Sequence, residues 1–228
     1  EATLSLNQYK KQRLKIVAPS GIMCAIVPNL RSFEQSMPEI DLELHDQIAT
    51  SPADLIFPDA DIVFSWGEGQ WPGWTSRHLT PNGHITPLCA PQLLKNGCLM
   101  STEEISQHAW IVSISLEDTW KRWYDALGVP LPKPPNVIKV TNSKMAVEAA
   151  FYGRGLVMGF GHGGFLSSGI LFNNLTCAHA FHALAPNFGY YLHTRPQVDN
   201  SAIERFKQWF FSEIWTIATL QKRLTSSA

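Results

Sequence analysis

The sequence has few cysteines, and their spacing matches no metal or redox motif. The 228 residues include four of them, Cys24, Cys89, Cys98 and Cys177. None stands in a C-x-x-C pair, and their neighbours in the sequence are mostly apolar. We therefore expect reduced structural thiols, which excludes a zinc site and a disulfide framework.

The sequence also lacks an excess of charge of either sign. The chain has 18 Lys and Arg against 19 Asp and Glu, a formal net charge of −1 and a pI near 6.8. A protein that binds nucleic acid needs a basic face, because its cations displace counterions from the phosphates. The balance of charge therefore argues against contact between this segment and DNA.

Long hydrophobic runs are missing as well. The most apolar stretches, 156–160 and 210–220, are interrupted or bordered by Gly, Ser, Glu or Thr. They are shorter than the ~20 residues that span a bilayer. Residues 1–14 contain no apolar run followed by small residues, so they are not a signal peptide. We expect a cytoplasmic protein with no membrane segment.

The sequence also lacks the motifs of known catalytic sites. The sequence contains no G-x-S-x-G, no P-loop and no Cys-His pair in a supporting order. The glycine-rich stretch 153–164 follows a predicted helix and precedes a strand, which is the reverse of a dinucleotide fingerprint. His179 and His182 form an H-x-x-H without the H-E-x-x-H context of a zinc site. We expect no enzyme, no cofactor and no metal.

What the sequence does contain is a regular alternation of strands and helices. Hydrophobic residues make up 45% of the chain, enough for a full core. Strands are predicted at 14–18, 40–44 and 62–64, and Ser51-Pro52 opens a short helix between the last two. A helix with Ser20 as its N-cap follows the first strand, because apolar residues recur every three or four positions at Ile22, Ile26, Leu30 and Phe33. This order predicts a parallel sheet covered by helices.

A second series of strands and helices follows the first. Strands are predicted at 85–89, 110–114, 137–140 and 156–160, with helices at 120–127 and 142–152 that stop at Gly128 and Gly153. Ser101 and Glu104 form a capping box before a short helix. After a strand at 190–194, an amphipathic helix at 203–220 has the length to dock back onto the first series.

Two successive series predict an α/β protein with two Rossmann-like lobes and a cleft between them, the type 2 periplasmic-binding-protein-like fold. We expect lobe I to comprise 14–86 plus 190–228 and lobe II to comprise 87–189, with 1–13 as the remnant of a linker. Ligands of such sheets bind at the carboxyl ends of the strands. The cleft is therefore where a function is expected.

Four phrases in this order resemble the sensing domain of LysR-type transcriptional regulators over about residues 14 to 215. They are LKIVAPSGIMCAIVPNLRSFEQSMPEIDLEL, ADIVFSWGEGQWPG, ITPLCAPQLL and VTNSKMAVEAAFYGRGLVMG. The aromatic-Gly-acidic-Gly loop together with PLCAP is similar to the branch that contains the glycine-cleavage activator and the β-lactamase regulator.

The resemblance implies a domain that binds a small-molecule effector and controls transcription through allostery. It also implies homodimers of the sensing domain, tetramers of whole chains, and promoter DNA bound only by a winged helix-turn-helix that would precede Glu1. Many members of the family carry a polar or basic residue where this chain has Met23-Cys24, which predicts a more apolar pocket or a less acidic ligand.

Two helix starts are candidates for the effector site. Ser20 and Gly21 begin the first helix, where amides and the helix dipole favour an anion such as a carboxylate. Thr141, Asn142 and Ser143 precede a helix of the second lobe in the same way. A ligand between the lobes would take hydrogen bonds from both starts, although Ser20 is equally well explained as a plain N-cap.

The loop that begins at Trp66 and the second crossing supply the other candidates. Trp66 and Glu68 would place an aromatic wall and a carboxylate near the cleft, and Glu68 with Ser20 would suit a zwitterion such as an amino acid or peptide. A solvated Glu68 and a packing tryptophan are the alternative. Tyr190 is expected to offer its hydroxyl or to be a buried hinge aromatic. Phe160, followed by His162, is expected to form the far wall.

Two other functions share this architecture. A solute-binding protein of a transport system has the same two lobes, but it would need an export signal or a lipid-anchoring cysteine, and neither is seen. An α/β enzyme would need an acid, a base and a nucleophile that converge in the cleft, and no such set stands out in the sequence.

Overall fold

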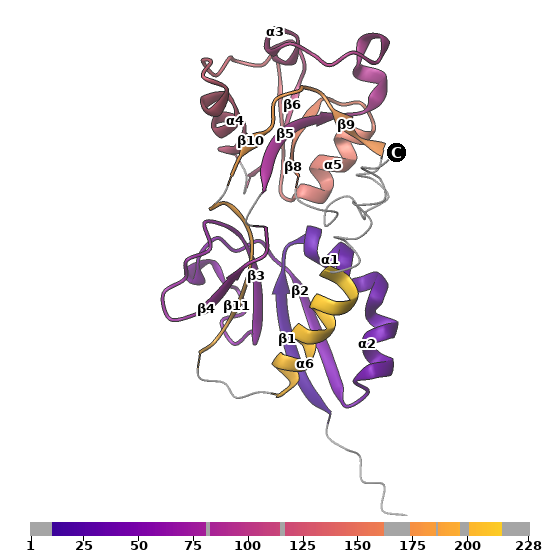
Figure 1. Ribbon diagram of the computed structural model, residues 1–228, viewed down its shortest axis with the longest axis vertical. Helices are drawn as coiled ribbons and strands as arrows, with labels where there is room; N and C mark the ends of the chain where they lie inside the picture. Colours follow the sequence, from indigo (N-terminus) through magenta and orange to yellow (C-terminus); the bar gives the residue numbers. More distant parts are fainter. Residues whose placement is uncertain are drawn as a thin grey trace, which may run out of the picture.

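The structure, a computed structural model, describes residues 11–80, 83–114, 117–161, 174–185, 187–196 and 201–215 of the chain. These residues form two α/β lobes, each built on its own sheet, that follow one another along the longest axis of the molecule (Figure 1). The predicted division into two lobes with successive sheets is confirmed.

The first lobe contains a five-stranded sheet in the order β2-β1-β3-β11-β4. Its strands are β1 (Gln12–Ala18), β2 (Ile40–Asp46), β3 (Ile62–Gly67), β4 (Thr75–His78) and β11 (Gly189–Thr194). β1 is parallel to β2 and β3, as predicted, whereas β11 runs antiparallel between β3 and β4. Every residue of β3 is buried, which explains its continuous apolar run. β4 was not predicted, because its residues are polar and show no alternation of apolar side chains; in the structure they are mostly exposed.

The second lobe contains a six-stranded sheet in which β10-β5-β8-β6-β7 are neighbours and β9 pairs with β5. Its strands are β5 (His84–Cys89), β6 (Trp110–Ser113), β7 (Val137–Val140), β8 (Leu156–Gly161), β9 (Thr176–Cys177) and β10 (Ala183–Leu184). β6 is parallel to β7 and β8, and β5 is antiparallel to β8. The four predicted strands of this series are present, with ends that shift by a residue or so.

The first predicted helix is divided in two. α1 (Ser20–Ile26) is followed by a 3-10 turn (Val27–Asn29) and then by α2 (Leu30–Ser36). Pro28 lies in the turn, and proline interrupts a helix because it lacks an N–H and its ring collides with the preceding turn. The N-cap is Pro19 and not Ser20, so that prediction was wrong. Ser20 is the first helical residue, and its hydroxyl donates to the carboxylate of Asp46.

The remaining helices follow the sequence signals more closely. They are α3 (Thr102–Ser106), α4 (Thr119–Leu127), α5 (Ser143–Phe151) and short 3-10 segments at Pro52–Asp54, Pro91–Leu93 and Lys95–Gly97. Ser101 and Glu104 form the predicted capping box of α3, and Gly128 ends α4 with a φ of 77°. The helix predicted after Ser51 is only a single 3-10 turn.

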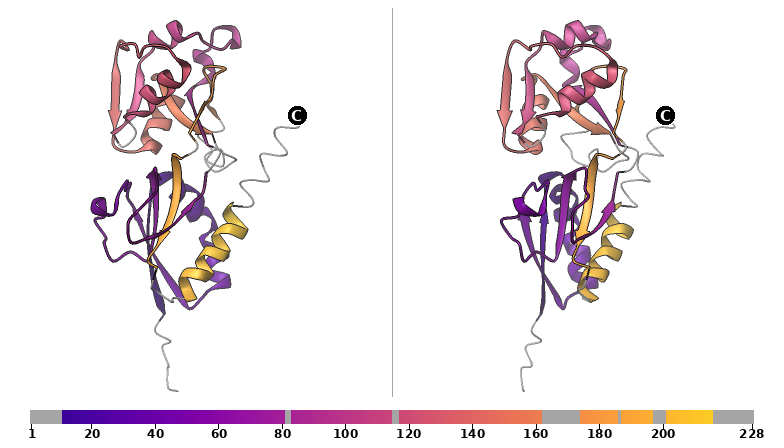
Figure 2. Two further views of the ribbon diagram at one scale, coloured as in Figure 1. Left: turned by 60° about the vertical axis from the view of Figure 1, so that its left-hand side comes forward. Right: turned by 90° about the vertical axis from the view of Figure 1, so that its left-hand side faces the viewer.

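The C-terminal helix packs on the first lobe, as predicted. α6 (Ser201–Trp209) continues into a π-helix (Phe210–Trp215), and residues 216–220 of the predicted helix lie outside the described residues. Phe210 lies 4.9 Å from Phe64 of β3, and Phe206 lies 6.0 Å from Phe33 of α2, both measured between ring centroids. Figure 2 shows α6, in yellow, along the flank of this lobe.

The chain passes from one lobe to the other in two segments that lie side by side, the first crossing near residues 79–84 and the second near residues 185–190. The amide of Leu79 donates to the carbonyl of Tyr190 at 2.8 Å, and the amide of Ala185 donates to the carbonyl of Gly83 at 2.9 Å. The exact lobe boundaries stay a prediction, but the linker assigned to 1–13 overlaps β1, which begins at Gln12.

The cysteines differ in their surroundings. Cys89 is buried and Cys177 is half-buried, whereas Cys24 and Cys98 are exposed, so apolar surroundings were wrongly predicted for those two. Burial raises the pKa of the Cys89 thiol to about 11, which keeps it protonated. All four thiols are free. Within the described ranges, no helix is both long and apolar enough to cross a membrane, and no group of side chains has the make-up of a metal site.

Candidate functional site

One pocket lies where the two lobes meet. Its lining comes from both lobes: Pro19, Ile48, Trp66, Ile85, Ile111, Val112, Ser113, Thr119, Ser143, Ala146, Val147, Val157, Met158, Gly159, Phe160 and Tyr190. Pro19 and Ile48 follow β1 and β2, and Trp66 and Ser113 lie at the ends of β3 and β6. The pocket is therefore at the carboxyl ends of parallel strands, where ligands of such sheets bind.

The pocket is small, and two helices border it. Its cavity volume is about 50 Å³. A single water needs ~10–15 Å³, so the pocket can hold several. Helix α1 of the first lobe is in contact with α5 of the second. Ser143, Ala146 and Val147 of α5 contribute to the wall.

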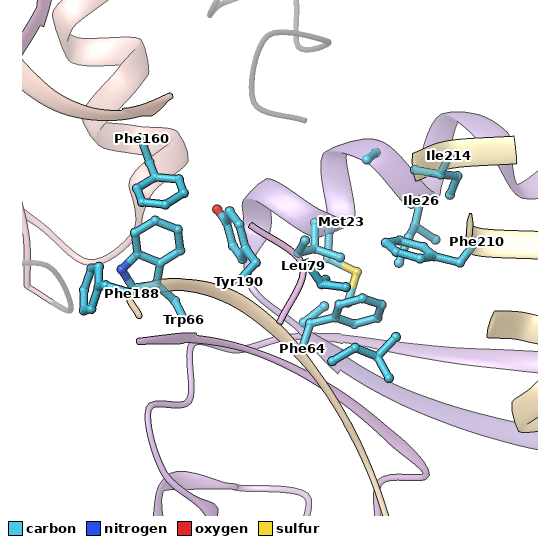
Figure 3. Close-up of a cluster of buried hydrophobic side chains, with 14 of the residues drawn as sticks. Met23, Ile26, Phe64, Trp66, Leu79, Phe160, Phe188, Tyr190, Phe210 and Ile214 are labelled. Atoms are coloured by element: carbon cyan, nitrogen blue, oxygen red, sulfur yellow. The ribbon is translucent and has the colours of Figure 1, made fainter. Parts of the chain in front are cut away.

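Four aromatic side chains form a cluster at the junction of the lobes (Figure 3). The ring of Trp66 meets the rings of Phe160, Phe188 and Tyr190 at centroid distances of 4.5, 5.3 and 4.5 Å. All three contacts are edge-to-face, an arrangement that aromatic quadrupoles favour. Trp66 belongs to the first lobe and Phe160 to the second, so the pocket wall itself joins the two lobes.

The indole nitrogen of Trp66 is a buried donor. The side chain is 5% exposed, and its Nε1 has no hydrogen-bond acceptor among the described residues. A buried N–H without a partner costs free energy that an acceptor on a bound molecule can recover. Trp66 also lines the pocket, so an acceptor on a bound molecule is one way in which this donor could be satisfied.

Tyr190 is held firmly at the second crossing. Its backbone amide donates to the hydroxyl of Thr80 at 3.0 Å, and burial raises the pKa of its phenol well above the usual value. The preceding residue is Gly189, where a Cβ would overlap the Thr80 hydroxyl. A Cβ at Gly83, on the other crossing, would overlap the ring of Phe160. Both crossings therefore need glycine for close approach.

Three hydroxyl residues supply the polar part of the lining. Ser113 ends β6, Thr119 begins α4 and Ser143 begins α5. Ser113 and Thr119 are buried, and Ser143 is half-buried. Asn142 is the N-cap of α5, with its side-chain oxygen accepting from the Met145 amide at 2.9 Å, so the Ser143 hydroxyl is not needed as a cap.

Ser20 lies close to the site but does not line it. Its hydroxyl is 2.9 and 3.1 Å from the two carboxylate oxygens of Asp46, at the end of β2, and the residue is 2% exposed. A carboxylate of the protein therefore occupies the position that the sequence assigned to a carboxylate of the ligand. Gly21, the next residue, is half-buried and does not line the pocket either.

Glu68 points away from the pocket. Its side chain is 74% exposed, and the nearest cation is the guanidinium of Arg122 on α4, 3.7 Å away. The same guanidinium lies 4.5 Å above the ring of Phe188 and 2.6 Å from Asp118. Glu68 thus takes part in an exposed ion pair between the lobes and contributes no wall to the pocket.

Several other predicted features also lie outside the pocket. Thr141 is exposed, with its hydroxyl 3.6 Å from the Met145 sulfur. Met23 is buried in the core of the first lobe and Cys24 is exposed, and neither is part of the pocket lining, so the more apolar pocket or less acidic ligand expected from them stays a prediction. His162 lies outside the described residues. Of the nine predicted site residues, the pocket brings together Trp66, Ser143, Phe160 and Tyr190.

Sequence reasoning missed most of the apolar lining. Ile48, Ile111, Ala146 and Val157 belong to the wall, and nothing in a single sequence separates such residues from ordinary core. The available signal was position, because Pro19 directly follows a predicted strand, Ile48 lies four residues after the next one, and Ser113 lies near the end of another. Reading every strand end, and not only the polar ones, would have found these three.

Behind the first sheet, His193 forms a separate buried network. Its Nε2 lies 2.6 Å from the Ser65 hydroxyl and its Nδ1 lies 2.8 Å from the Ser76 hydroxyl, while the ring stacks on Trp71 at 4.0 Å. Burial lowers the pKa of His193 to about 4, so the ring is neutral near pH 7. The histidine is fully buried and serves to hold β3, β4 and β11 together.

The sequence profile of the LysR substrate binding domain matches residues 7–213 of the chain. The chain belongs to this family. It is the effector-binding domain of a LysR-type transcriptional regulator, and the likeness does not favour a solute-binding protein of a transport system. The strand order of the first sheet, with β11 returning between β3 and β4, is that of the type 2 periplasmic-binding-like fold, which confirms the predicted fold class.

Similar proteins support the same membership. The effector-binding domain is 26% identical over 216 residues to the glycine cleavage system transcriptional activator of Escherichia coli K12, covering 93% of this chain and 69% of that protein. It is 30% identical over 139 residues to the HTH-type transcriptional activator AmpR of Rhodobacter capsulatus, covering 60% of this chain and 45% of that protein.

Solved structures share the fold of the effector-binding domain. It superposes on the effector domain of the transcriptional regulator AmpR of Pseudomonas aeruginosa with a TM-score of 0.71 and 22% identity, covering 93% of this chain and all of that one. The predicted resemblance to the branch of the glycine-cleavage activator and the β-lactamase regulator is confirmed by these relatives.

Proposed function

We propose that this domain binds a small-molecule effector in the pocket between its lobes and relays binding, as a change in lobe orientation, to a DNA-binding domain outside this chain. The observation that carries the proposal is a pocket with walls from both lobes, with Pro19 and Trp66 on one side and Ser143 and Phe160 on the other. A ligand that touches both lobes binds one arrangement of them better than another. That difference in affinity shifts the equilibrium between arrangements.

Within this proposal, the effector contacts Trp66, Ser143, Phe160 and Tyr190, together with Ser113 and Thr119. Ser20 and Asn142 act from outside the pocket, since one fixes Asp46 and the other caps α5. The zwitterionic effector expected from the sequence required Ser20 and Glu68 to reach the ligand. Neither residue lines the pocket, so this geometry gives that idea no support.

The proposal extends to assembly and location. We place the regulator in the cytoplasm, with sensing domains paired as homodimers, whole chains as tetramers, and promoter DNA bound only by a separate N-terminal domain. It carries no enzymatic activity and needs no cofactor. Membership in a family of transcriptional regulators supports these statements, and the size of the purified domain in solution tests whether sensing domains pair as homodimers.

A thermal-shift screen with a matched pair of variants tests the site. A ligand that binds the folded domain raises its melting temperature by mass action. Ser143→Leu places a larger side chain in the pocket, whereas Lys144→Leu changes the adjacent exposed residue of the same helix. We expect the shift to disappear in Ser143→Leu and to persist in Lys144→Leu. A saturable shift that survives Ser143→Leu would place the site elsewhere.

A further inference from the structure

The part of the pocket lining that the structure describes carries no formal charge. Among the described residues that form it, polar atoms come from three hydroxyl side chains, the indole of Trp66 and the phenol of Tyr190, and the other side chains are apolar. Tyr190 stays neutral because burial raises the pKa of its phenol. A bound molecule would therefore meet hydrocarbon, aromatic edges and a few neutral hydrogen-bonding groups.

Two carboxylates, Asp46 and Glu68, belong to loops or strand ends near the site, and each already has a partner within the protein. Asp46 accepts from the buried hydroxyl of Ser20, and Glu68 pairs with Arg122 on the exposed side of the junction. Removing an unpaired charge from water into an apolar site is costly, so a charged ligand needs a charged partner. Neither carboxylate is part of the wall, and neither can therefore serve as the partner of a ligand ammonium group.

The hydrogen-bonding groups of the pocket favour an acceptor on the ligand. Trp66 Nε1 is a donor that has no acceptor among the described residues. Ser143 is the first residue of α5, where free backbone amides and the helix dipole attract the negative end of a polar group. A neutral carbonyl, nitro or hydroxyl group satisfies both, while the faces and edges of Phe160 and Tyr190 suit an apolar or aromatic body.

We infer that the effector is an uncharged, mainly apolar or aromatic small molecule that carries a hydrogen-bond acceptor, and not a free amino acid or other zwitterion. This inference rests on the proposed function, because it describes the ligand of the same pocket. The space in this arrangement of the lobes, about 50 Å³, favours a small ligand.

One molecule that exists in both charge states gives the sharpest test. 4-Nitrophenol ionises near neutral pH without changing its shape, and nitrobenzene is a matched control that does not ionise. Calorimetric titrations of the 228-residue domain are run at several pH values across the pKa of the phenol. We expect the dissociation constant of 4-nitrophenol to rise about tenfold for each pH unit above that pKa, because only the neutral form binds. That of nitrobenzene is expected to stay constant.

The same titrations on Ser143→Leu and Lys144→Leu separate this inference from the proposed function. We expect both ligands to lose binding in Ser143→Leu and to keep it in Lys144→Leu. If 4-nitrophenolate binds as tightly as the phenol and Ser143→Leu abolishes its binding, the site stands and the inference of a neutral ligand is overturned. If neither compound binds in a way that Ser143→Leu removes, the proposed site is overturned together with the inference.

Discussion

Trp66 at the end of β3 packs edge-on against Phe160 of β8, with ring centroids 4.5 Å apart and ring planes at 86°. This pair joins the first lobe to the second, and both rings line the pocket. The ring of Phe160 also covers Gly83 on one of the crossings, where a Cβ would overlap it. A molecule that displaces either ring would therefore alter the contact that fixes the lobes relative to each other.

Phe160→Ala is expected to destabilise the domain more than a comparable change elsewhere on the second lobe. Phe160 is 7% exposed and loses its contact with Trp66 in this variant. Large-to-small changes of buried phenylalanine cost ~3–5 kcal/mol, and we expect about 3 because the ring borders a pocket. Urea unfolding measures the loss. Phe151→Ala, at the half-buried end of α5, is the control, and an equal loss there would contradict a special role for Phe160.

Ser20→Ala is expected to reduce stability and leave effector affinity unchanged. The variant loses the hydrogen bond from the buried hydroxyl to Asp46, which is worth about 1–2 kcal/mol. Since Ser20 does not line the pocket, the dissociation constant of any pocket ligand should stay within about twofold. Chemical denaturation and calorimetry check the two halves of this statement. A variant of normal stability that no longer binds would show that Ser20 contacts the ligand after all.

Glu68→Gln is expected to change little. Its ion pair with Arg122 spans 3.7 Å and the Glu68 side chain is 74% exposed, so solvent screens the interaction. Exposed pairs of this kind contribute ~0–1 kcal/mol, and Arg122 keeps Asp118 as a partner. We expect a melting temperature close to that of the unaltered domain, measured by calorimetry in low and high salt. A loss of ligand binding in this variant would contradict the exposed position of Glu68.

His193 is expected to make stability depend on pH below neutrality. Burial lowers its pKa from the ordinary 6.5 to about 4, so the unfolded chain takes up the proton first as pH falls. The free energy of unfolding is therefore fully present above about pH 6.5 and declines between pH 6.5 and 4, by at most about 1.4 kcal/mol per pH unit.

A variant isolates this contribution. His193→Asn removes the titrating ring, and unfolding in urea across that pH range should then show a shallower slope. His108→Asn, which removes a histidine of the second lobe outside this network, is the control. Equal slopes for His193→Asn and the unaltered domain would show that another group causes the dependence.

Most of the fold was predictable because strong local patterns agree with the tertiary structure. The strand at 62–64 is continuously apolar and is buried along its whole length, and Gly128 ends its helix in the left-handed conformation that glycine allows. The misses have local physical causes. Pro28 broke a pattern of apolar residues that looked continuous, and polar β4 is a strand only because β11 pairs with it.

The site was predictable only in part, because a sequence shows the position of a side chain but not its partner. Ser20 has the residue type and position of a ligand contact, yet its hydroxyl donates its hydrogen bond to Asp46, 26 residues further along the chain. Trp66 and Tyr190 were identified from their places at a strand end and at a crossing, which the fold fixes. The apolar wall formed by residues such as Val157 depends on how the two lobes meet, and no local pattern encodes that.

The most direct test of a site between the lobes is the NMR signal of the Trp66 indole N–H during titration with a ligand that stabilises the domain. The chain has 8 tryptophans, and the signal lost in Trp66→Phe identifies the right one. Our account predicts that this signal shifts and saturates with the same dissociation constant as the calorimetric titration, because the unpaired Nε1 gains an acceptor. A Trp66 signal that stays unmoved at saturating ligand would contradict binding between the lobes.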